Sequence, residues 1–499
     1  PTTTTAAPSS SEDAAAPELP GLPVPLLDPD DPNHPPPAPG SDPSPSGHEA
    51  SWAVGAPFGQ YRARVEVAST EAQRVDVTVD GLLVGSYSVG TVPRTLDALI
   101  HVDGPGTRLG VRSSAPVSVG TTALEPVAPT MTTRGTSILD PTGTVRQIRG
   151  TNRNGYQLAP EGSKAFNRFG HEGEHLWRWG MDVVRLPLNQ EFWLEDCAAS
   201  SSWVHDSPTR PDGSSWRYRE LVDEEVRRYT QRGIMVILDL HASSRGEATG
   251  CAADGHVLHE MPDVRSVAFW AGVAERYRDE PYVAFDLYNE PHLHDALEAP
   301  TEAEAERIWR DGGAVTYRDR SGLVPRTATY WTVGFQRLYD VIRETGATNL
   351  VLVAGLHYAN RPGVHLTQPL DATNLGASVH MYCLRCDEVA PDDQVRYTFG
   401  EASGEEPAFG VADRHPVVMT EFGTDEWWDS SDNRRYVEVF EGRGVGWLVW
   451  TWAGGGVGDG HEPFGILAES TLHTASRAPG PSGQAIWAAL APIRAARGV

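Results

Sequence analysis

The chain has 499 residues, 39% hydrophobic and 22% charged, which is enough for a large core and more than one domain. Its formal net charge of −26 argues against nucleic acid or an anionic membrane surface as a partner. No apolar run reaches the roughly 18 residues of a membrane-spanning helix, so we expect no membrane insertion.

The N-terminal segment, residues 1–49, is dominated by Pro, Ala, Thr, Ser, Asp and Glu and contains almost no aromatic residues. Such a composition cannot bury enough apolar surface to offset the entropy that is lost on ordering. It therefore predicts a disordered, Pro-rich linker that acts as a spacer to a partner module or as a stalk from the cell surface.

Residues 50–128 differ, because apolar and polar side chains begin to alternate with a period of two. With the hairpin signal Asp80-Gly81, this pattern predicts a small antiparallel β-sandwich of jelly-roll type. Carbohydrate binding through Trp52, Phe58 or Tyr87 is one interpretation of this module. We favour the other, a structural module, because its few aromatic residues can all be core. The alternating runs are Tyr61–Val67, Arg74–Val79, Leu82–Val89, Thr107–Arg112 and Val117–Gly120.

Residues 129–499 contain eight β-prone runs separated by amphipathic segments, and residues 292–328 form a long insertion after the fourth run. Eight strands with helical crossovers predict an α/β fold, the (β/α)8 or TIM barrel, whose functional residues lie at the C-terminal ends of the strands. The predicted strands are Val145–Asn152, Asp182–Leu188, Ile234–His241, Val283–Glu290, Asn349–Gly355, Gly376–Met381, Pro416–Phe422 and Gly446–Trp452. The predicted helices are Phe169–Gly180, Trp216–Gly233, Val264–Asp279, Thr329–Gly346, Asn433–Gly442 and Gln484–Ala496.

Two of these strands contain, near their C-terminal end, a glutamate that is followed within two residues by a proline or a glycine, which favour the end of a strand. Glu290 is followed by a proline, and Glu421 lies two residues before a glycine. A carboxylate at the end of a buried strand costs free energy unless something uses it. Each glutamate alone can cap a loop or pair with an arginine. Two that face each other across a pocket are what retaining glycoside hydrolysis needs, one as acid/base and one as nucleophile.

Further polar residues fall at the same ends of other predicted strands. With them, residues 145–455 resemble glycoside hydrolase family 5, a family of retaining clan A glycosidases that includes many cellulases and mannanases. Asn-Glu-Pro followed by His-x-Tyr and Glu-Phe-Gly, in this order and on separate strands, is a specific combination. The residues that carry the resemblance are Arg185, Asp239–His241, Tyr288–Pro291, His380–Tyr382, Thr420–Gly423 and the region of Trp450.

The resemblance implies a catalytic role for two residues and a supporting role for two others. Glu290 is the general acid/base, and the charge of Glu421 helps to raise its pKa. Glu421 is the nucleophile that forms the glycosyl-enzyme ester. Arg185 keeps this carboxylate ionised through charge-assisted hydrogen bonds, and Tyr382 donates to it as well. Without the resemblance, Arg185 could be a structural ion-pair partner and Tyr382 a packing residue.

The same resemblance implies the contacts with the sugar. Asn289 holds the 2-hydroxyl, and His241 and His380 line the subsite of the cleaved sugar, although His241 could also be a core histidine. A tryptophan of the last strand stacks beneath the sugar. Trp450 and Trp452 point to the same side of a strand, so both are candidates, and the spacing favours Trp450.

Five loop tryptophans are candidates for outer sugar subsites. Trp427 and Trp428 directly follow the strand of the predicted nucleophile, and the others are Trp193, Trp203 and Trp309. A loop tryptophan is more often a packing anchor, so we expect one or two of the five to contact sugar.

The four cysteines allow a metal site or disulfides. Cys383 and Cys386 have the spacing of two metal ligands, but a zinc site needs two more at suitable spacing, and no partner motif is visible. An even number of cysteines in an exported chain favours two disulfides. We therefore predict Cys197–Cys251, which ties the loops after the second and third strands, and Cys383–Cys386 within one loop. We expect no metal and no cofactor.

These predictions together describe a secreted or cell-surface, monomeric, retaining endo-β-1,4-glucanase that acts on a polysaccharide or oligosaccharide. A β-mannanase or another activity of the same family is an alternative, because the long loops around the predicted site choose the sugar. An exo-acting enzyme, with its cleft closed by residues 292–328, is another. A non-catalytic glycan-binding barrel would be expected if either glutamate were replaced, and both are present.

Overall fold

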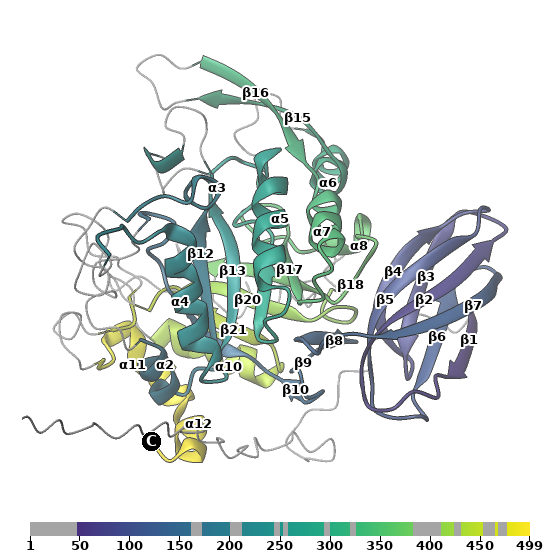
Figure 1. Cartoon of the computed structure of the whole chain (residues 1–499), viewed down its shortest axis with the longest axis horizontal. Helices are drawn as coiled ribbons and strands as arrows, with labels where there is room; N and C mark the ends of the chain where they lie inside the picture. The colour runs from purple at the N-terminus through teal and green to yellow at the C-terminus, as the bar shows by residue number, and fades with distance from the viewer. Residues whose placement is uncertain are drawn as a thin grey trace, which may run out of the picture.

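The computed structural model describes two joined regions, a β-sandwich and a closed barrel surrounded by helices (Figure 1). The predicted linker lies outside the described residues up to position 46. Structural statements below refer to the described residues, which are 47–160, 172–199, 212–243, 250–252, 258–293, 300–319, 326–382, 411–423, 431–452, 465–467 and 477–499.

The N-terminal region is the predicted antiparallel sandwich. A five-stranded sheet with the order β1-β6-β3-β4-β18 packs against a three-stranded sheet with the order β5-β2-β7. The period of two builds its core, because Val65 and Val67 are buried while Arg64 and Glu66 are exposed. The strands are β1 (His48–Ala53), β2 (Gly59–Ser69), β3 (Gln73–Val79), β4 (Leu82–Val89), β5 (Arg94–Val102), β6 (Arg108–Ser113) and β7 (Val117–Pro126).

Two details of the sandwich differ from the prediction. β1 begins at His48, inside the segment predicted to be disordered, because its residues pair with β6. β5 was not predicted, since residues 98–102 are buried on both faces and the alternation is lost there. Among the candidate sugar-binding aromatics, Tyr87 is buried and donates to the carbonyl of Asp97, whereas Phe58 is exposed.

The eight predicted barrel strands all exist, and they close into a parallel barrel in chain order. The first one was predicted too long. Val145 and Arg146 form β10, which joins β8 (Thr132–Arg134) and β9 (Ser137–Leu139) in a separate small sheet, because β10 pairs with β9. The barrel strands are β11 (Arg149–Asn152), β12 (Val183–Asn189), β13 (Met235–Ala242), β14 (Val283–Asp286), β17 (Val351–Ala354), β19 (Leu375–Tyr382), β20 (Val417–Gly423) and β21 (Gly446–Val449).

The helix predicted from Thr329 begins only at Phe335. Residues before it form β16 (Arg326–Val333), which pairs with β15 (Gly312–Asp319) in a hairpin at the top of Figure 1. The predicted insertion therefore contains a helix and a hairpin strand. The helices are α2 (Glu172–Trp179), α3 (Gln190–Glu195), α4 (Tyr218–Thr230), α5 (Arg265–Tyr277), α6 (Glu302–Asp311), α7 (Phe335–Glu344), α8 (Val364–Thr367), α10 (Ser431–Gly442), α11 (Pro481–Ala489) and α12 (Ala491–Arg497).

The sandwich and the barrel are joined by backbone and side-chain contacts. β18 (Ala372–Thr373), which lies between two barrel strands in the chain, pairs with β4 of the sandwich. Beside it, Asp371 accepts hydrogen bonds from Arg74 at 2.6 Å and from Arg94 at 2.8 Å. The barrel region thus supplies an edge strand and an anion to the sandwich.

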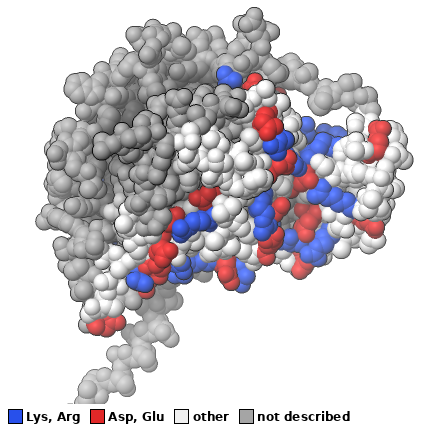
Figure 2. All heavy atoms as spheres, turned by 90° about the horizontal axis from the view of Figure 1, so that it is seen from above, with Lys and Arg blue, Asp and Glu red and all other residues white. Residues whose placement is uncertain are grey.

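Acidic and basic side chains are mixed over the sandwich and the neighbouring part of the molecule when it is seen from above (Figure 2). The described part of this face therefore carries no single-sign patch of the kind that attracts a polyanion. Within the described ranges, no helix is long and apolar enough to cross a membrane.

Candidate active site

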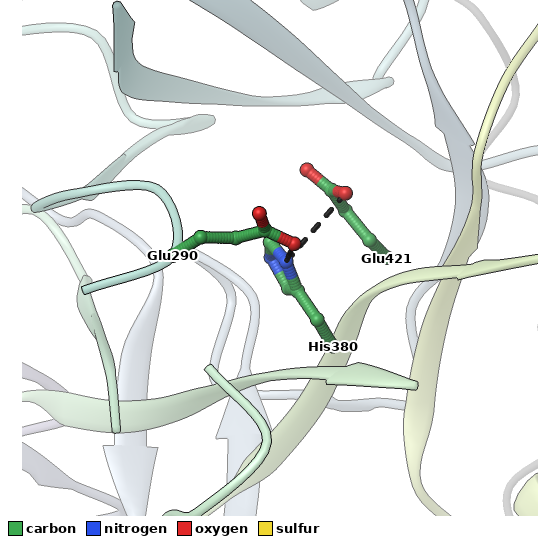
Figure 3. Close-up of side chains that lie close together, drawn as sticks. All are labelled: Glu290, His380 and Glu421. Carbon is green, nitrogen blue, oxygen red and sulfur yellow. Dashed lines mark hydrogen bonds and ion pairs between the residues drawn. The ribbon is translucent and has the colours of Figure 1, made fainter. Parts of the chain in front are cut away.

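Glu290 and Glu421 converge at the C-terminal end of the barrel strands, with His380 between them (Figure 3). One side-chain oxygen of each glutamate and one ring nitrogen of His380 all lie within 4.8 Å of one another. Residues 131 positions apart in the sequence (421 − 290) are therefore neighbours in one site.

The strands that carry these residues are irregular where the site forms. β19 and β20 pair with a register shift between Val379 and His380, and after this shift His380 lies opposite Glu421. A shift of this kind changes the direction of a side chain. Glu290 follows β14 with a φ of 48°, a left-handed conformation that is costly for a residue with a side chain. Backbone irregularity thus aims both glutamates into the site.

Glu421 is buried and is held by two hydrogen-bond donors, with a histidine close by. Nη1 of Arg185 bonds to its Oε1, and the hydroxyl of Tyr382 donates to its Oε2 at 2.7 Å. Nδ1 of His380 lies 3.5 Å from the same Oε2. These contacts fix the carboxylate in one orientation.

Glu290 has a different environment. Its pKa is raised above the ordinary value by burial, against the opposing effect of His241, His292 and Arg185. The sequence predicted that the pKa of Glu290 is raised, partly by the charge of Glu421. The structure attributes the rise to burial and not to Glu421. Nδ1 of His380 lies 3.0 Å from Oε1 of Glu290. Burial also lowers the pKa of His380 to about 3, so the imidazole is neutral at ordinary pH.

Arg185 is the centre of a buried charge network that the sequence only partly predicted. Its Nε donates to Asp286 at 2.9 Å. Its Nη2 lies 2.9 Å from Oδ1 of Asp239, where the two groups form an ion pair whose geometry is not that of a hydrogen bond. Burial raises the pKa of both aspartates to about 7, and Arg185 opposes this rise. The roles of Asp239 and Asp286 were missed, although both lie in the strings Asp239–His241 and 284–291 that were recognised.

His241 and Trp450 meet across the site. Nδ1 of His241 lies 2.7 Å from Asp239, which is two residues earlier on the same face of β13. The imidazole also stacks on Trp450, with ring centroids 5.3 Å apart and planes 6° apart. Trp452 was the other candidate for sugar stacking, and the structure contradicts it. Its indole is fully buried and donates to Glu172 of α2 at 2.7 Å, so it is a packing residue.

Asn289 and two residues near it complete the rim beside Glu290. Oδ1 of Asn289 accepts from Nη2 of Arg185 at 3.1 Å. The ring of His292 stacks on Tyr358 at 4.1 Å between centroids, and its Nδ1 lies 2.9 Å from the carbonyl oxygen of Glu290. Tyr358 was not predicted, and its position directly after the fifth barrel strand, in the string 356–360, was the signal that could have found it.

The candidates for outer sugar subsites divide in two groups. Trp193 and Trp309 are buried, Trp309 donating to the carbonyl of Ala354, so both are packing residues rather than subsites. Trp203, Trp427 and Trp428 lie outside the described residues.

One of the two predicted disulfides is confirmed. Cys197 and Cys251 are bonded, and their bridge links the loops after β12 and β13. Cys383 and Cys386, the other predicted pair, lie outside the described residues. Glu290, His380 and Glu421 each offer an atom that could bind a metal ion, but both oxygens of Glu421 already accept from Arg185 and Tyr382.

Comparison with protein families shows where the chain belongs. Residues 171–456 match Cellulase (glycosyl hydrolase family 5), which is more than half of the sequence. The chain is therefore a member of this family, and the resemblance stated from the sequence motifs is confirmed.

Individual relatives are distant. An endoglucanase of Thermobifida fusca is 23% identical over 330 residues, 64% of this chain and 54% of that protein. An endoglucanase of Paenibacillus polymyxa is 24% identical over 193 residues, 37% of this chain and 41% of that protein. The chain thus spans about half or less of the length of these curated relatives.

Solved structures confirm the barrel fold. An endocellulase of Pyrococcus horikoshii in complex with cellotetraose is 16% identical, with a TM-score of 0.54 over 74% of this chain and 99% of that chain. A β-glucanase of Saccharophagus degradans is 19% identical, with a TM-score of 0.51 over 74% of this chain and 94% of that chain.

Proposed function

We propose that this protein is a retaining endo-β-1,4-glucanase that hydrolyses its substrate by double displacement. The observation that carries the proposal is the close approach of two carboxyl groups, with oxygens within 4.8 Å. Retaining glycosidases hold their carboxyl groups about 5–5.5 Å apart, whereas inverting ones need about 6.5–9.5 Å to admit a water molecule. The short separation supports direct attack by one carboxylate.

Glu421 is the nucleophile in this proposal. It attacks the anomeric carbon, and the bond to the leaving oxygen breaks as the glycosyl-enzyme ester forms. Arg185 and Tyr382 support the role, because their hydrogen bonds hold the attacking carboxylate in place. Donors that are already in place need no reorganisation when the reaction occurs.

Glu290 is the acid/base. A raised pKa keeps it protonated, so it can deliver a proton to the leaving oxygen and later remove one from the water that cleaves the ester. The neutral His380 supports this role, because its Nδ1 lies 3.0 Å from Oε1 of Glu290, within hydrogen-bond distance.

The remaining residues of the site position the sugar. With its oxygen held by Arg185, Asn289 directs its amide N–H groups away from that network and can donate to the 2-hydroxyl. His241 and Trp450 form one stacked wall that suits the apolar face of a sugar ring. The names of the relatives, endoglucanase and β-glucanase, support a β-glucan as the substrate.

A product analysis tests the proposal. The enzyme is incubated with cellulose, mixed-linkage glucan, mannan and xyloglucan, and the first-formed anomer is recorded by proton NMR. We expect β-anomers and a range of oligosaccharides from the glucans. The α-anomer first would contradict retention, and preference for mannan would contradict the substrate. Glu421→Ala should remove hydrolysis while the fold remains, and appreciable turnover by this variant would contradict the nucleophile assignment.

The setting of the enzyme is also a proposal. We infer that it works outside the cell, because a disulfide such as Cys197–Cys251 persists in oxidising compartments, and that it acts on a polysaccharide as a monomer. Free-thiol titration of the exported protein and light scattering test these two points.

A further inference from the structure

The hairpin of β15 and β16 is firmly attached to the catalytic end of the barrel. The hydroxyl of Tyr330 donates to the carbonyl of Met261 at 3.1 Å and accepts from its N–H at 2.9 Å. The Tyr330 ring stacks on His259, with centroids 4.3 Å apart. The carbonyl of His259 in turn accepts from the hydroxyl of Tyr288 at 2.8 Å, two residues before Glu290. The hairpin is thus fixed to the loop after β13, close to the site.

The two faces of the hairpin differ sharply. The face toward the barrel carries buried residues, such as Val315, Tyr317 and Thr332. Strand alternation places Trp331 and Thr329 on the opposite face. Trp331 is 62% exposed, and it lies opposite Ala314.

The exposed face has a composition suited to a neutral, hydroxylated ligand. Beside Trp331, the hydroxyls of Thr316 and Thr329 bond to each other at 2.7 Å, and Thr327 continues the row. Trp331, Thr329 and Thr316 are uncharged, although the chain has a net charge of −26, and Arg318, paired with Thr327, follows them in the register of the hairpin. An indole offers a flat apolar surface, and threonine hydroxyls can donate or accept.

We propose that this face is a second glycan-binding site, the hairpin platform, formed by Trp331, Thr329 and Thr316. It binds a β-glucan chain outside the catalytic cleft, with the indole stacked on the apolar face of a glucose ring and the threonines bonded to its hydroxyls. The proposal rests on the proposed β-glucanase function. The rigid attachment of the platform means that polymer bound there is held beside the catalytic rim, which raises the local concentration of the same chain at the cleft.

The experiment separates binding of long chains from turnover of short ones. Trp331→Ala is compared with the parent in native gels that contain hydroxyethylcellulose or mixed-linkage β-glucan, and in turnover of cellotetraose. We expect retardation in the polymer gels to weaken, with the apparent Kd rising roughly fivefold. Turnover of cellotetraose should stay within about twofold, because a short chain fills the cleft without the platform.

Two matched variants accompany it. Trp331→Phe keeps an aromatic surface and should retain most of the retardation. Val92→Ala removes an exposed apolar side chain from the sandwich and should leave the retardation as it is in the parent. Thermal unfolding of all variants verifies that they are folded, which the exposure of both positions favours.

Each outcome decides the question. Equal retardation of Trp331→Ala and the parent overturns the platform while the glucanase function stands. If Trp331→Ala loses polymer retardation and cellotetraose turnover to the same extent, Trp331 belongs to the catalytic cleft, and the proposed platform is overturned. If light scattering shows that the parent is a dimer and the Trp331→Ala variant a monomer, the face is a contact between copies of the chain, and the platform is overturned. If the parent neither binds nor hydrolyses any β-glucan, the proposed function itself fails.

Discussion

The barrel and the sandwich bury polar groups in different ways. In the barrel, Arg185 is inaccessible to solvent and lies against Asp239, Asp286 and Glu421. In the described sandwich, the buried polar residues are uncharged, since burial lowers the pKa of His101 and favours its neutral form, and an ion pair such as Arg62–Asp97 remains partly exposed. Both regions have a continuous apolar core, so the difference is not a matter of packing.

The comparison indicates what the buried charges are for. Removing charges from water costs several kcal/mol per ion, and a well-packed apolar cluster of the same volume is often as stable. The sandwich shows that this chain can build a core without them. Arg185 lies within β12 and Asp239 within β13, and Arg185 bonds directly to Glu421, so this network is best explained by the reaction.

The largest expected effect concerns Glu290. Glu290→Gln removes the proton donor, so kcat on cellulose should fall by about 10³-fold. The raised pKa of Glu290 means that the parent loses activity as pH rises through that value, and the variant should lack this alkaline limb. Rates across pH on cellulose, and on an aryl cellobioside whose leaving group needs no proton, make the measurement. An equal loss on both substrates would contradict the role of acid.

The next prediction compares the loss of stability on replacing one arginine of the barrel with the loss on replacing one arginine of the sandwich. Arg185→Met leaves three buried carboxylates without their cation, so the free energy of unfolding should fall by about 3–5 kcal/mol. Arg62→Met removes a partly exposed pair in the sandwich and should cost less than about 1 kcal/mol. Urea unfolding of both variants measures the difference. Similar costs would mean that the two regions handle charge alike.

The sequence predicted the barrel well because its strands are uniform. β12, β13 and β20 are short β-prone runs that end at polar residues, and their pattern alone gives the strand order and the end at which the site lies. The hairpin was missed, since Thr327 to Val333 has both a helical and a strand interpretation until it pairs with β15. Local pattern cannot reveal a pairing partner.

In the active site, the catalytic residues were easier to predict from the sequence than the contacts that surround them. Glu290 and Glu421 were found from their strings, but the choice between Trp450 and Trp452 depended on the chain leaving the strand at Val449. With the strand ending there, Trp450 reaches His241 and Trp452 reaches α2. The partners of Asp286 come from β12 and β19, so its buried contacts could not be read from its own strand.

The pH dependence of stability tests the comparison between the buried charges of the barrel and the charges of the sandwich, with an effect of intermediate size. Burial raises the pKa of Asp286 to about 7, so the folded protein holds a proton that the unfolded chain releases near pH 4. This contribution to stability is complete below about pH 4 and is lost as pH rises through 7. The parent should therefore lose about 3 kcal/mol more than Asp286→Asn between pH 4.5 and 7.5, measured by urea unfolding.

A sandwich residue provides the control of opposite sign. The hydrogen bond from Arg134 lowers the pKa of Asp103, so its contribution is present above the ordinary pKa and is lost as pH falls. Asp103→Asn should therefore leave the loss of stability toward neutral pH in place. If Asp286→Asn and the parent show the same pH dependence, Asp286 is ionised throughout the range.

The smallest expected effect lies where the two regions meet. Burial alone would raise the pKa of Asp371, but Arg94 and Arg74 lower it below its usual range. Asp371→Asn keeps the shape and removes the charge, so the free energy of unfolding should fall by about 1 kcal/mol. Glu344→Gln removes an exposed pair with Arg337 and should change it by less than about 0.5 kcal/mol.

The same variant decides how the sandwich relates to the enzyme. Because β18 and Asp371 come from the barrel region, a structural sandwich should unfold together with the barrel in a single calorimetric transition. Asp371→Asn should then lower that transition as a whole. If it instead separates an early sandwich transition from an unchanged barrel transition, the sandwich is an independent module that is only tethered there. Its exposed Phe58 would then be the first position to examine for a ligand.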